Sequence, residues 1–173
     1  MSQLMAQQDI RTHTIAVLVD NEAGVLARVI GLFSGRGYNI ESLTVAEVDA
    51  NERLSRITLV TSGTPMVIEQ IKAQLGRLVP VRKVSDLTVE GPSVGRELAL
   101  IKVVGAGEKR IESLRIADIF RANVVDSTHD SFVFEIVGKT EKLDAFIKLM
   151  EPLGLAEISR TGAAAIARGN TAF

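Results

Sequence analysis

The hydrophobic positions near the start of the chain follow first a strand spacing and then a helix spacing. Residues 12–19, "THTIAVLV", are rich in β-branched residues and are typical of a strand. Val25, Val29 and Phe33, with apolar neighbours between them, then recur on one helical face until the glycines of "SGRG". The pattern therefore predicts a strand followed by an amphipathic helix.

Two more strands and a second helix are expected next. Residues 39–48 and 53–61, joined by the polar "DANE", predict a hairpin. Thr64 is placed to cap a helix whose first residue is Pro65, a position where the missing N–H costs nothing. A strand over residues 81–89 follows that helix. The order is thus strand, helix, strand, strand, helix, strand.

The second half of the chain repeats this order. The predicted elements are a strand over 96–105, a helix from Glu108 to Phe120, strands over 123–130 and 131–138, a helix from Thr140 to Glu151, and a strand over 155–162. Six elements in this order are typical of the ferredoxin-like βαββαβ motif, an antiparallel sheet with both helices on one face. The predicted class is α+β with two such domains.

The four prolines fall at element boundaries and support a division of the chain. We expect an N-terminal tail over 1–10, a first domain over 11–90, a linker over 91–95 and a second domain over 96–173. In "LSRITLV" both alternating sets of side chains include apolar residues, so neither face of the first sheet is expected to be fully solvated. We therefore expect that sheet to pair with another subunit or domain.

Composition excludes several classes of partner and site. A formal net charge of −1 over 173 residues supplies no basic field to hold nucleic acid. The absence of cysteine excludes disulfides and thiolate metal sites and fits a reducing cytoplasm. No apolar run approaches the ~20 residues of a membrane span, and "MSQLMAQQDI" lacks the features of a signal peptide. A cytoplasmic protein without nucleic-acid or membrane partners is expected.

Catalysis by this chain's own side chains is not predicted. The two histidines, His13 and His129, have no partner at the spacing of a nucleophile or of metal ligands. Asp126, His129 and Asp130 cluster on a predicted turn, where such residues are common. "GAGEKR", residues 105–110, lacks the third glycine and the lysine-serine ending of phosphate loops, so it favours a strand-to-helix turn.

The loop "DNEAG", residues 20–24, allows two interpretations. Asn21 is placed to cap the helix, with Glu22 near the positive end of its dipole and Gly24 easing the turn. A helix start also carries about four N–H donors without partners in the helix, of which one asparagine satisfies one or two. Because Gly24 has no Cβ, a small carboxylate could reach the remaining donors.

Asn39 stands at the other end of the same helix, just after Gly37. It is either a turn residue that tolerates unusual backbone angles or an acceptor for a ligand ammonium group. Within one chain the two asparagines would lie ~20 Å apart, since a helix rises ~1.5 Å per residue. They would meet only across a symmetric dimer.

The stretch "NEAGVLARVIGLFSGRGYNIESLTVA" closely resembles the regulatory small subunits of acetolactate synthase, also called acetohydroxyacid synthase. The resemblance continues through "LSRITLV", "QIKAQLGRLVPVRKV" and "KLDAFIKLMEPLGLAEISRTGAAAIARG" and covers about residues 11–170. It implies that the first domain is an ACT domain, an amino-acid-binding module of ferredoxin-like fold, and that the second domain has a similar architecture.

The resemblance also implies a role. Members of this family are not catalysts and hold no cofactor; they bind a large subunit (EC 2.2.1.6) that uses thiamine diphosphate, Mg²⁺ and FAD to condense two pyruvates, or pyruvate and 2-oxobutyrate. The small subunit raises that activity and confers feedback inhibition by valine in branched-chain amino-acid synthesis. We expect the exposed ACT sheet to meet the large subunit.

Effector binding in this family implies a homodimer through the ACT domain. Backbone N–H groups of the helix-start loop would hold the valine carboxylate, and the Asn21 side chain would bond the ligand's polar end. Asn39 and Ile40 of the partner subunit would close the site. Carried onto this sequence, the loop consists of Asn21, Glu22, Ala23, Gly24, Val25 and Leu26.

Other functions are weighed against this one. A free-standing ACT-type amino-acid sensor acting on another enzyme is the main alternative. An RNA-recognition module shares the element order, but it stacks bases on sheet aromatics, and "TIAVLV" and "RLSRITLV" contain none.

Overall fold

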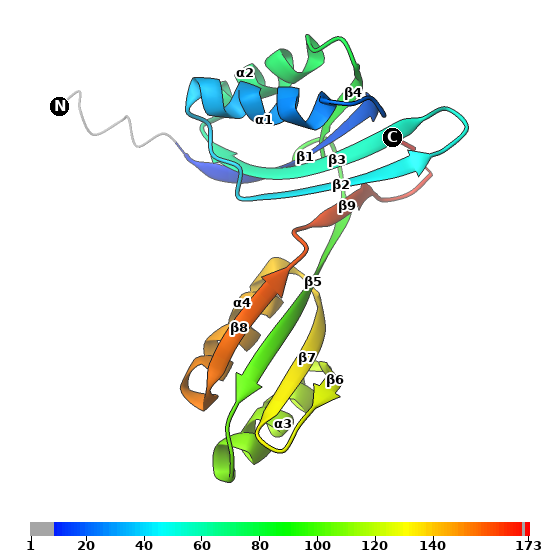
Figure 1. Ribbon diagram of the computed structural model, residues 1–173. Helices are drawn as coiled ribbons and strands as arrows, with labels where there is room; N and C mark the ends of the chain where they lie inside the picture. Colours follow the sequence, from blue (N-terminus) through cyan, green and yellow to red (C-terminus); the bar gives the residue numbers. More distant parts are fainter. Residues whose placement is uncertain (1–8, 171) are drawn as a thin grey trace, which may run out of the picture. The chain divides into compact units, whose positions relative to one another are not determined.

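The first sheet carries the expected ferredoxin-like motif. The structure is a computed structural model that describes residues 9–170 and 172–173. Its four strands are antiparallel in the order β2-β3-β1-β4, and α1 and α2 lie on one face (Figure 1). The elements are β1 (Arg11–Asp20), α1 (Val25–Arg36), β2 (Ser42–Asp49), β3 (Leu54–Gly63), α2 (Pro65–Gly76) and β4 (Val81–Asp86).

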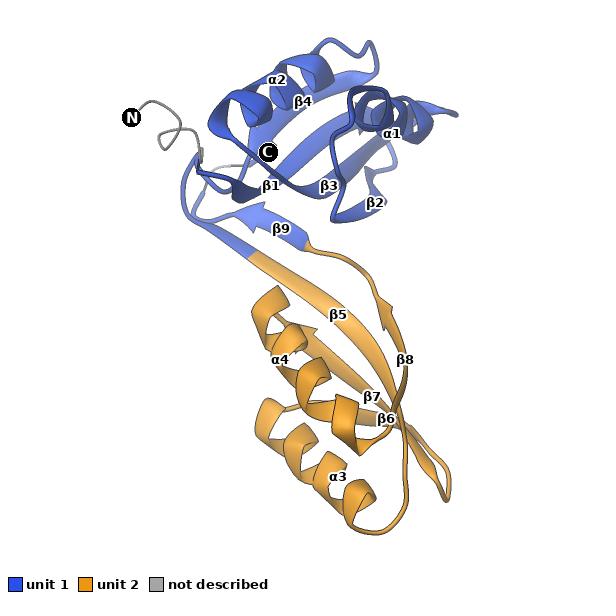
Figure 2. Cartoon of the chain, turned by 90° about the vertical axis from the view of Figure 1, so that its left-hand side faces the viewer, with its two compact units in different colours: residues 1–94, 164–173 blue, residues 95–163 orange. Residues whose placement is uncertain are grey.

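The second sheet repeats the motif with the order β6-β7-β5-β8. Helices α3 and α4 lie on one face of it (Figure 2). The predicted class, α+β with two ferredoxin-like βαββαβ motifs, is confirmed. The elements are β5 (Ser93–Val104), α3 (Glu108–Phe120), β6 (Asn123–Ser127), β7 (Ser131–Gly138), α4 (Thr140–Met150), the 3₁₀ turn η1 (Glu151–Leu153) and β8 (Leu155–Arg160).

The core of the first motif follows the predicted periodicities. Alternate residues of the central strands β1 and β3 point toward the helices, because strand side chains alternate between faces. Both helices meet them with residues three and four apart, as an amphipathic helix requires. Thr64 caps α2, with its side chain accepting from the Val67 N–H at 3.3 Å. The buried set is Ile15, Val17, Val19, Val25, Val29, Phe33, Ile57, Leu59, Ile68, Ile71 and Leu75.

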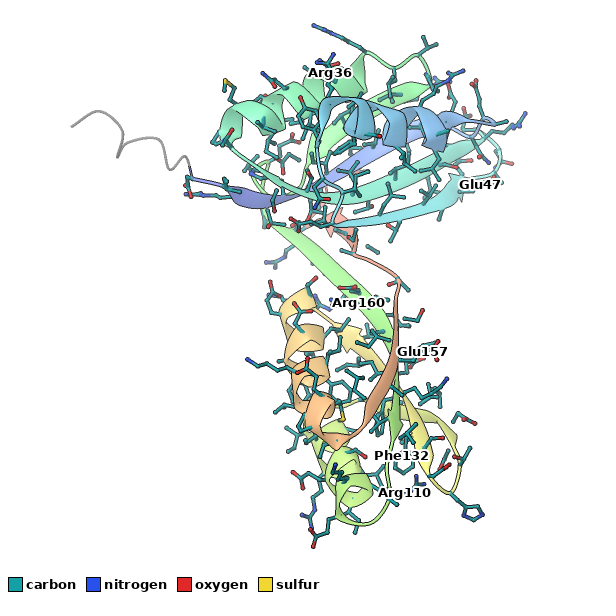
Figure 3. All side chains as sticks on the ribbon, turned by 60° about the vertical axis from the view of Figure 1, so that its left-hand side comes forward. Arg36, Glu47, Arg110, Phe132, Glu157 and Arg160 are labelled. Carbon is teal, nitrogen blue, oxygen red and sulfur yellow. The ribbon has the colours of Figure 1, made fainter. Side chains whose placement is uncertain are left out.

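An ion network links the strands of the second motif. Arg160 on β8 donates from Nε and Nη2 to the buried Glu97 on β5, at 2.7 and 2.9 Å, and from Nη1 to Asp144 on α4 at 2.7 Å (Figure 3). The hydrogen bonds that Arg160 donates to Glu97 are the main cause of the raised pKa of the Arg160 guanidinium. A bidentate pair of this kind fixes the relative position of two strands.

The compact units differ from the predicted domains at the C-terminus. One unit holds the described residues up to Val94 together with 164–173, and the other holds 95–163 (Figure 2). The predicted linker 91–95 is partly strand, since β5 begins at Ser93. A short strand, β9 (Ala164–Ala167), pairs with β5 and is absent from the sequence prediction. Residues 1–8 of the predicted tail lie outside the described residues.

The same C-terminal segment changes the expectation for the open face of the first sheet. We expected another subunit or domain to cover it. β9, from the end of the predicted second domain, lies across from the helices (Figure 1), and its Ala165 is buried with Ala16 of β1 and Leu87. Part of the face is therefore covered by the chain's own end, through contacts between residues far apart in sequence. Pairing with another subunit stays a prediction.

A buried polar pair closes one end of the first sheet. His13 on β1 lies 2.7 Å from a carboxylate oxygen of Asp86 on β4, measured from Nδ1, and both residues are buried. The other oxygen of Asp86 accepts from the Thr88 N–H at 3.0 Å. No partner of His13 is visible in the sequence, because Asp86 stands 73 positions away.

We predict that His13→Ala lowers the free energy of unfolding by ~1 to 3 kcal/mol, because it leaves a buried carboxylate oxygen without its partner. His129→Ala is the matched control, since His129 is exposed between β6 and β7, and it should change stability by less than ~0.5 kcal/mol. Urea denaturation of both variants measures the difference. Equal, small losses would contradict a stabilising role for the His13–Asp86 contact.

Candidate functional site

The first helix starts without a side-chain cap. Its N-cap is Gly24, in the left-handed region at φ 83°, and no side chain bonds to the cap. The prediction that Asn21 caps the helix is wrong. The chain makes a turn first, with the Glu22 N–H donating to the Asp20 carbonyl at 2.9 Å, and this turn places Asn21 three residues before the cap.

Asn21 is held by the β2–β3 hairpin instead. Its backbone N–H donates to the Arg53 carbonyl at 2.7 Å, and its side-chain Nδ2 donates to Glu47 Oε2 on β2 at 2.6 Å. Figure 3 shows Glu47 on that strand. The amide is thereby oriented, and its oxygen makes no hydrogen bond within the described chain. The sequence could not indicate Glu47 as a partner, because β2 reaches Asn21 only through sheet pairing.

Backbone donors at the helix start remain available. The Arg28 N–H bonds the Gly24 carbonyl at 3.1 Å and closes the first turn. The N–H groups of Leu26 and Ala27 have no acceptor among the residues that the structure describes. Gly24 is exposed, and a Cβ placed on it would meet nothing within 4 Å. The positive end of a helix dipole is thus open to a small anion.

The surroundings of these donors are mixed. Glu22 and Ala23 are exposed, Leu26 is half-buried, and Val25 is buried in the first core. No acidic residue lies in the first turn of the helix. An anion at this position would therefore meet no carboxylate from that turn, and it would have an apolar surface beside it.

The other end of α1 is the predicted turn. Gly37, at φ 71°, ends the helix, and the Tyr38 N–H donates to the Phe33 carbonyl at 3.0 Å. The Asn39 backbone carbonyl accepts from Thr61 Oγ1 at 2.6 Å. The Asn39 side chain is exposed and makes no hydrogen bond to a described residue, and Ile40 packs against the first core.

One chain does not bring the two asparagines together. Asn21 follows the end of β1, where Asp20 pairs with Leu54, whereas Asn39 is bonded by Thr61, which pairs with His13 near the start of β1. The sites therefore lie at opposite ends of the sheet. They do not meet within one chain, and their meeting across a dimer stays a prediction.

The remaining sequence candidates have ordinary structural roles. Gly107, at φ 62°, is the N-cap of α3, so "GAGEKR" is the expected strand-to-helix turn. Asp126, His129 and Asp130 are exposed on β6 or in the turn that follows it. Across residues 9–170 and 172–173, no group of three or more His, Asp or Glu side chains is placed to hold a metal ion. None of the helices in those ranges has the length and apolar character to cross a membrane.

Comparisons with known proteins match both halves of the chain. A family described as "AHAS small subunit-like ACT domain" matches residues 15–83, and one described as "Small subunit of acetolactate synthase" matches residues 96–169. The probable acetolactate synthase small subunit of Archaeoglobus fulgidus is 51% identical over 158 residues, which cover 91% of this chain and 98% of that protein. The small subunit of Aquifex aeolicus is 48% identical and covers 92% of this chain and 82% of its own length.

A solved structure agrees with these sequence matches. The crystal structure of the acetolactate synthase small subunit from Thermotoga maritima superposes with a TM-score of 0.83 at 38% identity. The match covers 93% of this chain and 99% of that one. Fold, sequence and the predicted ACT motif all lead to one assignment, and the chain belongs to the family of acetolactate synthase small subunits, which are regulatory subunits.

Proposed function

We propose that this chain activates the catalytic large subunit of acetolactate synthase and makes it sensitive to valine. The observation that carries the effector proposal is the uncapped start of α1, where Gly24 leaves backbone N–H groups open to a carboxylate. Membership of the small-subunit family supports the proposal that the partner is the catalytic large subunit. That partner holds the thiamine diphosphate, Mg²⁺ and FAD, whereas this chain supplies binding and regulation.

The proposed valine site lies between two ACT domains of a homodimer. The backbone N–H groups of Leu26 and its neighbours donate to the valine carboxylate. The free oxygen of the Asn21 amide accepts from the ligand ammonium. Glu47 supports this arrangement, because its hydrogen bond with Nδ2 directs that oxygen away from β2. Asn39 and Ile40 of the partner subunit close the site, with the unpaired Asn39 amide as a further polar contact.

Regulation requires that valine bind two arrangements of the dimer unequally. A ligand with equal affinity for both would shift nothing. Coupling between effector and catalytic sites is typically ~1 to 3 kcal/mol, or about 5- to 150-fold in affinity. We propose that the arrangement favoured by valine supports the active large-subunit site less well.

Reconstitution tests the whole proposal. Adding the purified chain to the large subunit should raise the rate of acetolactate formation, and valine should then lower it. Calorimetric titration of valine into the chain alone should give binding heat. If the chain binds valine but leaves the large subunit's turnover unchanged, it acts as a free-standing sensor and the proposed partner is wrong.

We predict that Asn21→Ala weakens valine inhibition about threefold to tenfold while activation stays intact, since one hydrogen bond contributes ~1 kcal/mol. The inhibition constant for valine in the reconstituted enzyme measures the change. Asn51→Ala is the control, because Asn51 is exposed in the β2–β3 turn. An unchanged valine response in Asn21→Ala would remove Asn21 from the site.

We predict a larger loss for Gly24→Asp, because it places a negative charge where the effector carboxylate must lie. Gly24→Asn is the matched control: asparagine has nearly the same shape, and both residues tolerate the left-handed backbone of this position. The inhibition constant for valine should rise at least tenfold more with aspartate than with asparagine. Equal effects would show that the site does not bind an anion at Gly24.

A further inference from the structure

The last residues of the chain form a strap over the sheet face opposite the helices. The C-terminal strap is defined as the described residues 164–170 and 172–173. It begins as β9, which pairs with β5, and the Arg168 N–H then donates to the Pro92 carbonyl at 2.9 Å. Backbone hydrogen bonds thus tie the strap to the start of β5.

The strap faces the sheet with apolar side chains, most of which are small. Ala165 is buried with Ala16 and Leu87, and Ala167 and Phe173 pack against this cluster. Ile166, between the two alanines, is 60% exposed and points away. The strap therefore shields Ala16 and Leu87 with three side chains, two of which are alanines.

Two cations hold the end of the strap. The Phe173 ring centroid lies 4.8 Å from Arg56 Cζ and 5.0 Å from Lys83 Nζ, so both charges interact with one aromatic ring. Arg56 also donates from Nη2 to the Ala165 carbonyl at 2.6 Å. Arg56, near the start of β3, thus contacts both ends of the strap.

Arg56 is an unusual anchor, because no carboxylate of a described residue pairs with it. Its side chain is partly buried, and this burial lowers its pKa. The contacts that its guanidinium makes, to the Ala165 carbonyl and to the Phe173 ring, both come from the strap. Arg56 therefore stabilises the closed position of the strap.

The strap is also imperfectly packed. A cavity of about 150 Å³ remains beneath it, lined among others by Ser85, Leu87, Pro92, Ala167 and Phe173. The eleven-residue core on the other face of the sheet includes none of the strap. Segments with few buried apolar contacts open locally, without global unfolding.

We propose that the C-terminal strap is a latch: it opens and closes over the outer face of the ACT sheet while the core of that domain stays folded, and Arg56 and Phe173 hold it closed. Opening uncovers Ala16 and Leu87, which then present an apolar strip of sheet. The latch lies on the sheet face opposite α1, so it is separate from the proposed valine site.

Single cysteines test the latch, because the natural chain has none. Ala165→Cys reports on the strap, Val17→Cys on the buried core, and Ile166→Cys on a freely exposed position of the same strap. The rate of thiol labelling by a maleimide is measured in the full chain. We expect Ile166→Cys to react fastest and Ala165→Cys to react at least tenfold faster than Val17→Cys.

The side chains of Arg56 and Phe173 are then substituted, one at a time, in the Ala165→Cys and Val17→Cys variants. Arg56→Gln and Phe173→Ala should each raise the labelling rate of Ala165→Cys at least tenfold and leave that of Val17→Cys unchanged. Arg36→Gln, at an exposed arginine of α1 (Figure 3), is the control for charge loss and should change neither rate. If Ala165→Cys labels as slowly as Val17→Cys, or if both anchor variants leave its rate within twofold, the strap is part of the cooperative core and the latch is refuted.

Discussion

The central strand β1 must bury both of its faces, and the rest of the first unit is arranged around that constraint. β1 pairs with β3 on one side and β4 on the other, so neither of its edges is free. Ile15, Val17 and Val19 face the helices, and Ala16 on the opposite side is also fully buried. Two helices cover the first set, and the chain's own C-terminal segment covers Ala16. Ala16 is small, and the C-terminal segment packs on it with small side chains, whereas the large apolar side chains of β1 lie on the helix side.

The same strand positions the candidate effector loop. Asn21 directly follows β1, and its backbone N–H donates to the carbonyl of Arg53 in the turn before β3. Glu47 on β2 then orients the amide. The loop is therefore attached to β1 and to the β2–β3 hairpin, while the helix that follows begins at a glycine with its donors open. Binding sites whose supporting residues lie on strands keep their geometry better than sites built on loops alone.

The second unit has the same topology but a different set of polar contacts. Arg110 on α3 lies over the Phe132 ring at 3.7 Å and donates to the Thr128 carbonyl at 2.8 Å, which ties the helix to the β6–β7 hairpin (Figure 3). Glu97, Arg160 and Asp144 link two strands with α4. The first unit closes its sheet with His13 and Asp86 instead. One motif is thus stabilised by unrelated contacts, which explains why the two halves share element order without visible sequence identity.

The sequence by itself determined the elements of the two ferredoxin-like motifs and their order, and it led to the proposed location of the candidate site. The alternation of a strand and the spacing of a helix are local properties of the sequence. Thr64, Pro65 and Gly37 also act only on the backbone within a few residues of themselves. The helices, the strands and their ends can therefore be predicted from the sequence. Tertiary structure decided the rest. Glu47 became the partner of Asn21 in place of the predicted helix cap, Asp86 became the partner of His13, and residues 164–173 joined the first unit rather than the second. Each of these contacts joins residues brought together only by sheet pairing and packing, and a side chain's partner across that distance is not encoded in the spacing of its neighbours.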